Sequence, residues 1–63
     1  MDNVADQIKA MRLRSGLSQE RFGKKYQIPK RSIQNWESGI SEPSAYVLYL
    51  LTRVIDMDYP RTF

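Results

Sequence analysis

The sequence predicts an all-α fold, a small bundle of four short helices to which a fifth could be added at the C-terminus. Three observations lead to this prediction. Apolar residues recur three and four positions apart, which is the spacing of one face of a helix. Residues that start and stop helices, namely Ser, Pro and Gly, stand between these segments. The length of 63 residues allows one domain at most, so residues 1–63 are treated as a single unit.

The first helix is expected over residues 3–15 and the second over residues 18–26. One face of the first helix is formed by apolar residues at helical spacing, Val4, Ile8 and Met11. Two residues that can cap its start are available, Asp2 and Asn3. Ser15-Gly16 is a stop signal, and Ser18 then serves as the N-cap of the second helix.

A turn at Gln27-Ile28 is expected to separate the second helix from a third helix over residues 29–38. Pro29 suits the first turn of this third helix, because its missing N–H would have had no partner within the helix. Gly39 marks the end of the third helix, since glycine readily adopts the backbone conformation that closes a helix.

A fourth helix is expected to begin at Pro43-Ser44 and to be the most apolar of the four. Its apolar stripe is formed by Val47, Leu50, Leu51 and Val54. Beyond Ile55 the chain contains a proline and shows little periodicity. Residues 56–63 are therefore expected to form a C-terminal tail or a short turn.

The composition argues against an enzyme and against a membrane protein. The chain has no cysteine, no histidine, no converging acid pair and no glycine-rich phosphate loop, so no catalytic residue, metal or cofactor is expected. The longest apolar stretch, residues 47–51, is far shorter than the ~20 residues that a membrane span needs. A soluble cytoplasmic protein is expected.

The charges are unevenly distributed along the chain. Residues 7–38 contain eight basic and two acidic side chains, whereas the rest of the chain contains two basic and five acidic ones. A clustered basic segment suits a polyanion such as nucleic acid, because each neutralised phosphate releases condensed counterions. The same charges would also suit an ordinary solvated helix face. Charge alone leaves both interpretations open.

The residues between 19 and 38 favour two short helices packed closely together. The large apolar positions in this segment are Phe22, Tyr26, Ile28, Ile33 and Trp36. Gly23 has no side chain at the point where the two helices would cross most closely. The opposite side of the third helix carries side chains able to hydrogen-bond base edges in the major groove, Lys30, Arg31, Gln34 and Asn35. This second pattern favours nucleic acid as the partner.

A resemblance to the helix-turn-helix of the Cro/CI-type (XRE) family of phage and bacterial regulators is carried by residues 17–39, LSQERFGKKYQIPKRSIQNWESG. It extends to Pro43-Ser44 and covers roughly residues 5–55. The resemblance implies a lambda-repressor-like helix-turn-helix bundle with its motif at about residues 18–38. It also implies that the second helix of the motif docks in the major groove of double-stranded DNA.

The resemblance also assigns roles to individual side chains. By position, Lys30, Arg31 and Asn35 would contact bases, with Gln34 as a weaker candidate. Phosphate contacts would come from Ser18, Gln19, Ser32 and Ser38. Glu37 matches a family acid that pairs with an arginine of the first helix, which by position is Arg12. This ion pair is expected to be structural.

The family further implies a transcriptional repressor or autoregulator that acts at the nucleoid, as a homodimer on a palindromic operator. A dimer interface is expected from apolar residues near the C-terminus, Tyr46, Tyr49, Met57, Tyr59 and Phe63. The alternative is an antitoxin, an interaction module on the same fold. It would bind a protein partner such as a toxin through the fourth helix and the tail, with DNA binding secondary.

The sequence departs from the family pattern at three places. Gln27 stands where the turn usually has glycine, and a non-glycine residue in left-handed geometry costs roughly 1–2 kcal/mol. Either the turn differs or this cost is tolerated. Pro29 replaces a Ser or Thr N-cap, so the side-chain cap is lost. The loop after Gly39, often basic in relatives, reads Ile40-Ser41-Glu42, which predicts a weaker contact with the DNA backbone.

Overall fold

The computed structural model describes residues 3–60 and shows four α-helices and no strand within that range. The helices are α1 (Val4–Ser15), α2 (Gln19–Tyr26), α3 (Lys30–Ser38) and α4 (Ala45–Asp58). The all-α prediction is confirmed. Each helix begins one position after a residue that caps it, so the expected starts at residues 3, 18 and 29 are N-caps rather than helical residues.

Local hydrogen bonds explain why the helices begin and end where they do. Three N-cap side chains each accept a bond from the backbone N–H three residues on, at 2.8 Å for Asn3 and 3.2 Å for Ser18 and Ser44. At the other ends, Gly16 and Gly39 adopt the left-handed conformation that closes α1 and α3. These local caps mark the starts of α1, α2 and α4 and the ends of α1 and α3.

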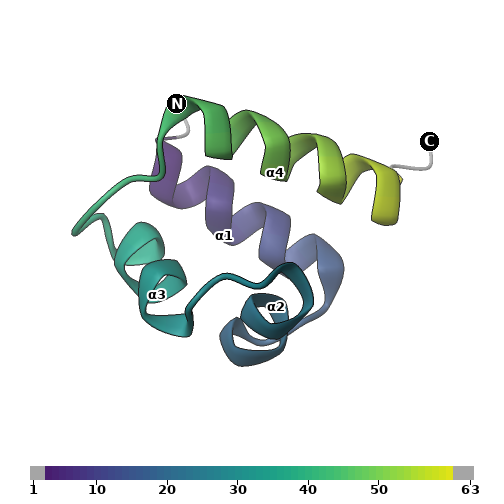
Figure 1. Ribbon diagram of the computed structural model, residues 1–63, viewed down its shortest axis with the longest axis horizontal. Coiled ribbons are helices and arrows are strands. Elements are labelled where there is room, and N and C mark those ends of the chain that lie inside the picture. Colours follow the sequence, from purple (N-terminus) through teal and green to yellow (C-terminus); the bar gives the residue numbers. More distant parts are fainter. Residues whose placement is uncertain (1–2, 61–63) are drawn as a thin grey trace.

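Helix α1 lies between α4 on one side and the α2–α3 pair on the other (Figure 1). It packs against all three of the other helices, and α2 and α3 also pack against each other. The backbone of α4 approaches α1 but neither α2 nor α3. The helix-turn-helix pair is therefore supported from behind by α1, while α4 is attached to the far side of that support.

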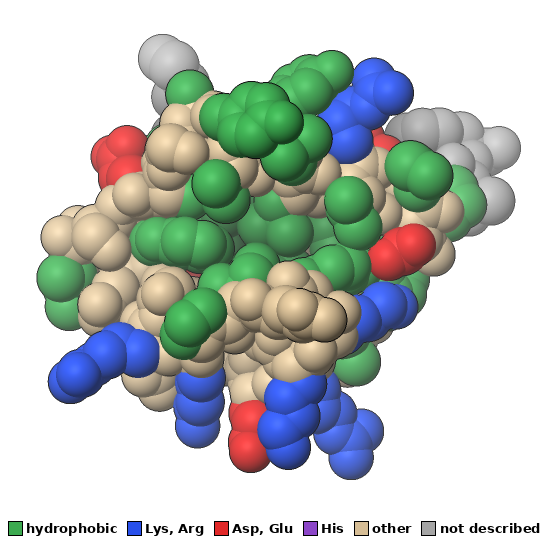
Figure 2. Space-filling view, in the orientation of Figure 1, with side chains coloured by type: hydrophobic (Ala, Val, Ile, Leu, Met, Phe, Trp, Pro, Cys, Tyr) green, Lys and Arg blue, Asp and Glu red, His purple; other side chains and the backbone are tan. Residues whose placement is uncertain are grey.

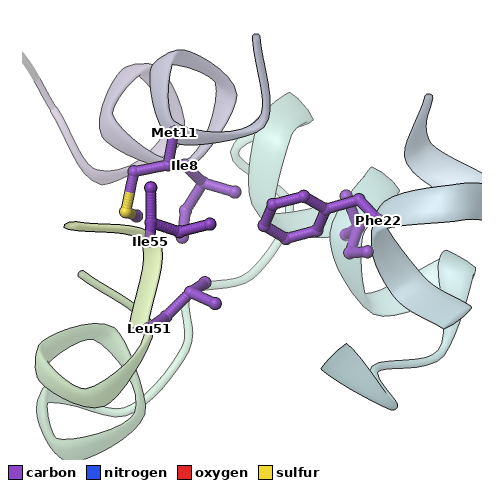
Figure 3. Packing of buried hydrophobic residues seen from close by; sticks show 6 residues of the cluster. Ile8, Met11, Phe22, Leu51 and Ile55 are labelled. Carbon is purple, nitrogen blue, oxygen red and sulfur yellow. The ribbon is translucent and has the colours of Figure 1, made fainter. Parts of the chain in front are cut away.

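The core lies where the inner faces of the helices meet around α1. Its buried side chains are Ile8, Met11, Phe22, Ile33, Leu51 and Ile55, five of which are labelled in Figure 3. Trp36 is half-buried against this core, on the side of α3 that the sequence predicted. Burial of these side chains holds α1 and α3 together and so fixes the direction in which the outer face of α3 points.

The predicted apolar stripe of α4 is only partly correct. Leu51 is buried, but Val47, Leu50 and Val54 are 38%, 42% and 37% exposed. The inner face of α4 is formed instead by Leu48, Leu51 and Ile55. The backbone of α4 comes close to that of α1 only, so the helix buries the line of residues that faces the core and leaves the neighbouring line largely uncovered.

The predicted end of α4 at Ile55 is wrong, because the helix continues to Asp58. Tertiary contacts stabilise these additional residues: the hydroxyl of Tyr26 donates to Asp58 at 2.8 Å, and Tyr59 packs against the core. The expected tail therefore begins later than residue 56, and residues 61–63 lie outside the described part of the chain. Among the described helices, none has the length and apolar character needed to cross a bilayer.

Candidate nucleic-acid interface

A close approach of α2 to the turn before α3 fixes the geometry of the helix pair. The backbone N–H of Ile28 donates to the carbonyl of Gly23 at 2.8 Å. A Cβ added at Gly23 would lie 2.5 Å from the carbonyl oxygen of Ile28 and 3.3 Å from Cδ1 of Ile33. Glycine is therefore required at position 23 because no side chain fits between the two segments.

Gln27 closes α2 in the left-handed conformation, with φ 56° and ψ 44°. Its backbone N–H donates to the carbonyl of Gly23, as in a glycine-closed helix. The turn thus keeps the geometry of the family pattern despite the non-glycine residue, and the chain tolerates a cost of roughly 1–2 kcal/mol.

Pro29 is the N-cap of α3 and makes no side-chain cap hydrogen bond. The carbonyl of Pro29 instead accepts from the backbone N–H groups of Ser32 and Ile33, at 2.9 and 3.3 Å. Helix α3 therefore begins at Lys30, one residue after the expected start at about residue 29. Lys30 and Arg31 consequently occupy the first two helical positions, at the end of α3 nearest the turn.

The outer face of α3 is polar and the inner face is apolar. Lys30, Arg31, Gln34 and Ser38 are exposed, whereas Ile33 is completely buried. Ser32 and Asn35 lie half-buried at the margins of the exposed face. The structure thus brings the expected base-contacting residues onto one side of one helix, with Gln34 more exposed than Asn35.

Arg12 and Glu37 join α1 to α3 through a two-point ion pair. Nε of Arg12 donates to Oε2 of Glu37 at 2.7 Å, and Nη2 donates to Oε1 at 3.0 Å. The side chains are only 14% and 7% exposed. Hydrogen bonding to Glu37 raises the pKa of Arg12 above its usual value. Glu37 is therefore paired beneath the outer face and does not oppose a phosphate there.

A family model described as helix-turn-helix matches residues 8–60, which includes α1 from Ile8 onward, the whole motif and α4. The chain belongs to the Cro/CI-type (XRE) helix-turn-helix family. Comparison with curated proteins and with solved structures gave no significant match. Membership of this family makes the chain a DNA-binding transcription regulator, and family members are regulators rather than enzymes.

Three of the four side chains expected to contact phosphate in this helix-turn-helix regulator lie at the ends of the motif, and the fourth, Ser32, lies in the first turn of α3. Ser18 is exposed, and its Oγ caps α2. Gln19 is half-buried, and its Nε2 donates to Oε1 of Glu37 at 3.4 Å, so the Arg12–Glu37 pair also positions this amide. The hydroxyl of Ser38 donates to the carbonyls of Gln34 and Asn35, at 2.8 and 3.3 Å.

Basic side chains lie along the lower edge of the molecule in Figure 2, over α2 and α3. The exposed basic residues of these two helices are Arg21, Lys24, Lys25, Lys30 and Arg31. Lys24 also forms a surface pair with Glu20 at 3.7 Å. Five of the eight basic residues of the segment 7–38 thus lie on these two helices, and this edge is suited to a polyanion.

Among the residues expected in a dimer interface, Tyr46, Tyr49 and Met57 are exposed, by 70%, 58% and 76%. Tyr59 is instead half-buried against the core of its own chain, and Nζ of Lys25 donates to its hydroxyl at 2.8 Å. Phe63 lies outside the described residues. The structure therefore leaves the α4 residues available to a partner but commits Tyr59 to its own domain.

Sequence reasoning missed a polar cluster that fastens the C-terminal end of α4 to α1 and α2. Arg14 donates to Asp56 at 2.6 Å and to the carbonyl of Tyr59 at 3.1 Å. Tyr26 donates to Asp58, and Nζ of Lys25 lies 3.9 Å from the same carboxylate. The only signal in the sequence was that two acidic residues and a tyrosine stand close together in the segment 56–63, which was interpreted as a tail.

Proposed function

We propose that this regulator binds double-stranded DNA in a sequence-specific manner by placing the outer face of α3 in the major groove. The observation that carries the proposal is that Lys30, Arg31 and Gln34 are exposed together on α3, whereas Ile33 of the same helix is completely buried. Because α1 and α2 hold the inner face rigidly, these three side chains would meet the bases without first reorganising the domain.

The chemistry of the exposed face matches the hydrogen-bonding groups of base edges. Arg31 or Lys30 can donate to O6 and N7 of guanine, and the amides of Gln34 and Asn35 can bond both N6 and N7 of adenine. Each good two-point contact contributes about 1–3 kcal/mol of discrimination. Asn35 is half-buried, so Gln34 is the better placed of the two amides.

The flanking hydroxyl and amide groups would set the position of α3 on the duplex. Ser18 and Gln19 stand at the start of α2, where a helix N-terminus and a side chain can meet phosphate together. Ser32 and Ser38 stand beside the base-contacting residues on α3. The exposed loop Ile40-Ser41-Glu42 adds no basic side chain, so a single domain would bind only modestly.

Modest affinity of one domain favours a repressor or autoregulator that acts as a dimer on a palindromic operator. Two copies would place two α3 helices on half-sites about one helical turn apart. Such a protein would act at the nucleoid, in the cytoplasm. The apolar α4 surface supports the proposed dimer, since it remains exposed in the single chain.

The proposal can be tested by titrating a randomised duplex library at two salt concentrations. The wild type should enrich an inverted repeat, and the Lys30→Ala/Arg31→Ala variant should enrich nothing. A Lys9→Ala/Lys24→Ala variant removes the same charge outside α3 and should keep the sequence preference. Weak, salt-sensitive binding that is equal in the wild type and the α3 variant would leave only nonspecific electrostatics.

A second candidate function is an antitoxin whose main partner is a protein bound through α4. The exposed apolar side chains of α4 favour it. Arg31→Ala separates the two functions: in a repressor it abolishes operator binding and leaves folding and oligomeric state intact. In an interaction module the complex with the protein partner survives the substitution.

A further inference from the structure

The ammonium group of Lys25 is held by several groups of its own domain. Its Nζ donates to the hydroxyl of Tyr59 at 2.8 Å and lies 3.9 Å from the carboxylate of Asp58. It also lies over two aromatic rings, 4.7 Å from the centroid of Tyr59 and 5.6 Å from that of Tyr26. A cation within about 6 Å of a ring face is attracted by it, so the rings act in the same direction as the carboxylate. Lys25 is therefore engaged before any DNA is bound.

The direction in which Lys25 points separates it from the outer face of α3. Gly23 faces the turn and α3, since a Cβ added there would meet Ile28 and Ile33. Successive residues of an α-helix are about 100° apart, so Lys25 lies about 200° around α2 from Gly23. Figure 1 shows the C-terminal end of α4 on the side of the molecule where α2 lies, with α3 on the other side. Lys25 therefore points away from α3 and toward the end of α4.

Polar contacts join α2 to α4, although the backbones of these two helices do not approach each other. The hydroxyl of Tyr26 donates to Asp58 at 2.8 Å, beside the bond from Lys25 to Tyr59. Lys25 and Tyr26 are the last two residues of α2, whereas Asp58 ends α4 and Tyr59 is its C-cap. We call these four residues the α2–α4 clasp. The clasp joins the C-terminal ends of the two helices.

The clasp lies directly before the strained residue of the helix pair. Gln27 follows Tyr26 and adopts the left-handed conformation, with φ 56°. A non-glycine residue persists in this conformation only where the surrounding contacts impose it. The turn that begins at Gln27 leads to Lys30, the first residue of α3. Contacts that fix the end of α2 against α4 therefore hold the turn, and with it the first residues of α3.

We infer that Lys25 is a positioning residue that acts through the clasp, and that it does not contact DNA. Its charge joins the end of α2 to the end of α4, which keeps the turn at Gln27 closed and the base-contacting end of α3 in place. This inference rests on the proposed DNA-reading function and adds to it the residue that supports the turn. The positive charge offered to DNA then comes from side chains such as Lys30 and Arg31, which have no side-chain partner among residues 3–60.

DNA affinity measured over a range of salt concentrations tests the inference, at a temperature where every variant is folded. The probes are the duplex that the wild type enriches most from a randomised library and a scrambled duplex of the same length. Lys25→Met removes the charge and keeps a side chain of similar length. It should weaken the enriched duplex at least about threefold more than the scrambled one, because a relaxed turn displaces the base-contacting residues. The slope of log affinity against log salt should stay unchanged, since no phosphate contact is lost.

Two control variants accompany Lys25→Met. Lys30→Met removes a charge on the outer face of α3 and should lower the salt slope by about 0.9, the value for one phosphate. Lys25→Arg keeps the charge and the contact with the rings, so it should bind both duplexes as the wild type does. A lower slope with equal losses on both duplexes in Lys25→Met would make Lys25 a phosphate contact and overturn the inference. Unchanged affinity for both duplexes would show that the clasp only stabilises the fold, and would also overturn it.

The route through Tyr59 has its own test. Tyr59→Phe keeps the ring and removes the hydroxyl that Lys25 bonds, so it should lower the preference for the enriched duplex in the same direction. In the double variant the two losses should combine to less than their sum, since both substitutions break the same contact. Tyr46→Phe, at an exposed position of α4, is the matched control and should leave the preference unchanged. Fully additive losses would overturn the clasp as the route by which Lys25 acts.

Failure of this inference can be distinguished from failure of the proposed function. A wild type that enriches no sequence would contradict the DNA-reading proposal alone. The salt slope on a random duplex and the unfolding temperature then decide the role of Lys25. Lys25→Met should lower the unfolding temperature and leave the slope unchanged, and its effect on that temperature should be smaller in a Tyr59→Phe background. A lower slope at an unchanged unfolding temperature would overturn the inference.

Discussion

Arg12 on α1 and Glu37 on α3 form two parallel hydrogen bonds, of 2.7 and 3.0 Å, across 25 positions of the chain. Nη1 of Arg12 also donates to the carbonyl of Leu17 at 3.1 Å, and Nε2 of Gln19 reaches Glu37 from α2. Three consecutive helices are thus tied together at one carboxylate. This arrangement holds α2 and α3, the two helices of the motif, in a fixed relation to each other and to α1, which supports them.

Removing one partner of this pair is expected to destabilise the domain strongly. Arg12→Ala or Glu37→Ala leaves a charge that is largely buried and unpaired, and should lower the free energy of unfolding by about 3 kcal/mol. The double variant Arg12→Met/Glu37→Leu should lose much less, because no charge is stranded. Urea unfolding followed by Trp36 fluorescence measures both. Equal losses in the single and double variants would contradict this account.

Replacing Gln27 with glycine is expected to stabilise the domain. Glycine adopts the left-handed conformation without strain, and the gain is reduced by the greater freedom of glycine in the unfolded chain, leaving about 0.5–1 kcal/mol. Gln7→Gly in α1 is the matched control and should destabilise by about 1 kcal/mol. Thermal unfolding measures the two shifts, which should have opposite signs.

Gly23→Ala is expected to cost about 3 kcal/mol, because the new Cβ meets a backbone carbonyl that cannot move without opening the turn. Gly16→Ala should cost only about 1–2 kcal/mol, since it introduces left-handed strain where no atom lies within 4 Å of the new Cβ. The comparison separates steric conflict from backbone strain. A Gly23→Ala domain as stable as Gly16→Ala would show that the turn can relax.

Gln19→Ala is expected to weaken DNA binding to the same extent for every sequence, by a few-fold. One N–H of the Gln19 amide is used by Glu37, and the other is available to a phosphate, which carries no sequence information. Arg31→Ala, in contrast, should weaken the operator far more than a scrambled duplex. Fluorescence anisotropy with both duplexes checks this, and an unequal loss in Gln19→Ala would place Gln19 among the base readers.

Stability is expected to fall at high pH through Tyr26. Burial, followed by its hydrogen bond to Asp58, raises the pKa of the Tyr26 hydroxyl well above its usual value. The stabilising contribution of a raised pKa is complete below the unfolded pKa of about 10 and is lost as pH rises above it. The hydrogen bond from Lys25 to Tyr59 raises the pKa of Lys25 and acts in the same direction.

The measurement for this prediction is urea unfolding at several pH values on both sides of 10. Tyr26→Phe should lose stability less steeply above pH 10 than the wild type does. Tyr46→Phe, at an exposed position, should follow the wild-type curve. Identical slopes in all three proteins would mean that ionisation of Tyr26 has no part in alkaline unfolding.

Most helix boundaries and the motif itself could be predicted from sequence to within one residue, because their signals are local. Asn3, Ser18 and Gly39 act within one turn of their own helix, and the spacing of Phe22 and Ile33 already placed them inside. The outer face of α3 could then be predicted as the positions of that helix that were not assigned to the core. The backbone conformation of Gln27 remained open, since residue propensity alone does not tell whether packing will impose the left-handed conformation there.

The features of α4 could not be predicted in the same way, because they depend on its neighbours. Two lines of apolar residues run along this helix at equally good helical spacing, one through Leu50 and one through Leu51. Only the tertiary packing of α4, closest to α1, decides which line is buried. The end of the helix at Asp58 depends likewise on Tyr26 and Arg14, which lie more than thirty positions away along the chain.

The position of α4, whose backbone approaches α1 but neither α2 nor α3, has a consequence for how such a regulator can diverge. Substitutions on the uncovered line of α4 do not touch the backbone or the inner face of α3. A duplicated gene could therefore acquire a new assembly preference while both copies still recognise the same operator. The converse also holds, since changes at Lys30 or Arg31 leave α4 untouched, and the two kinds of selectivity can evolve one at a time.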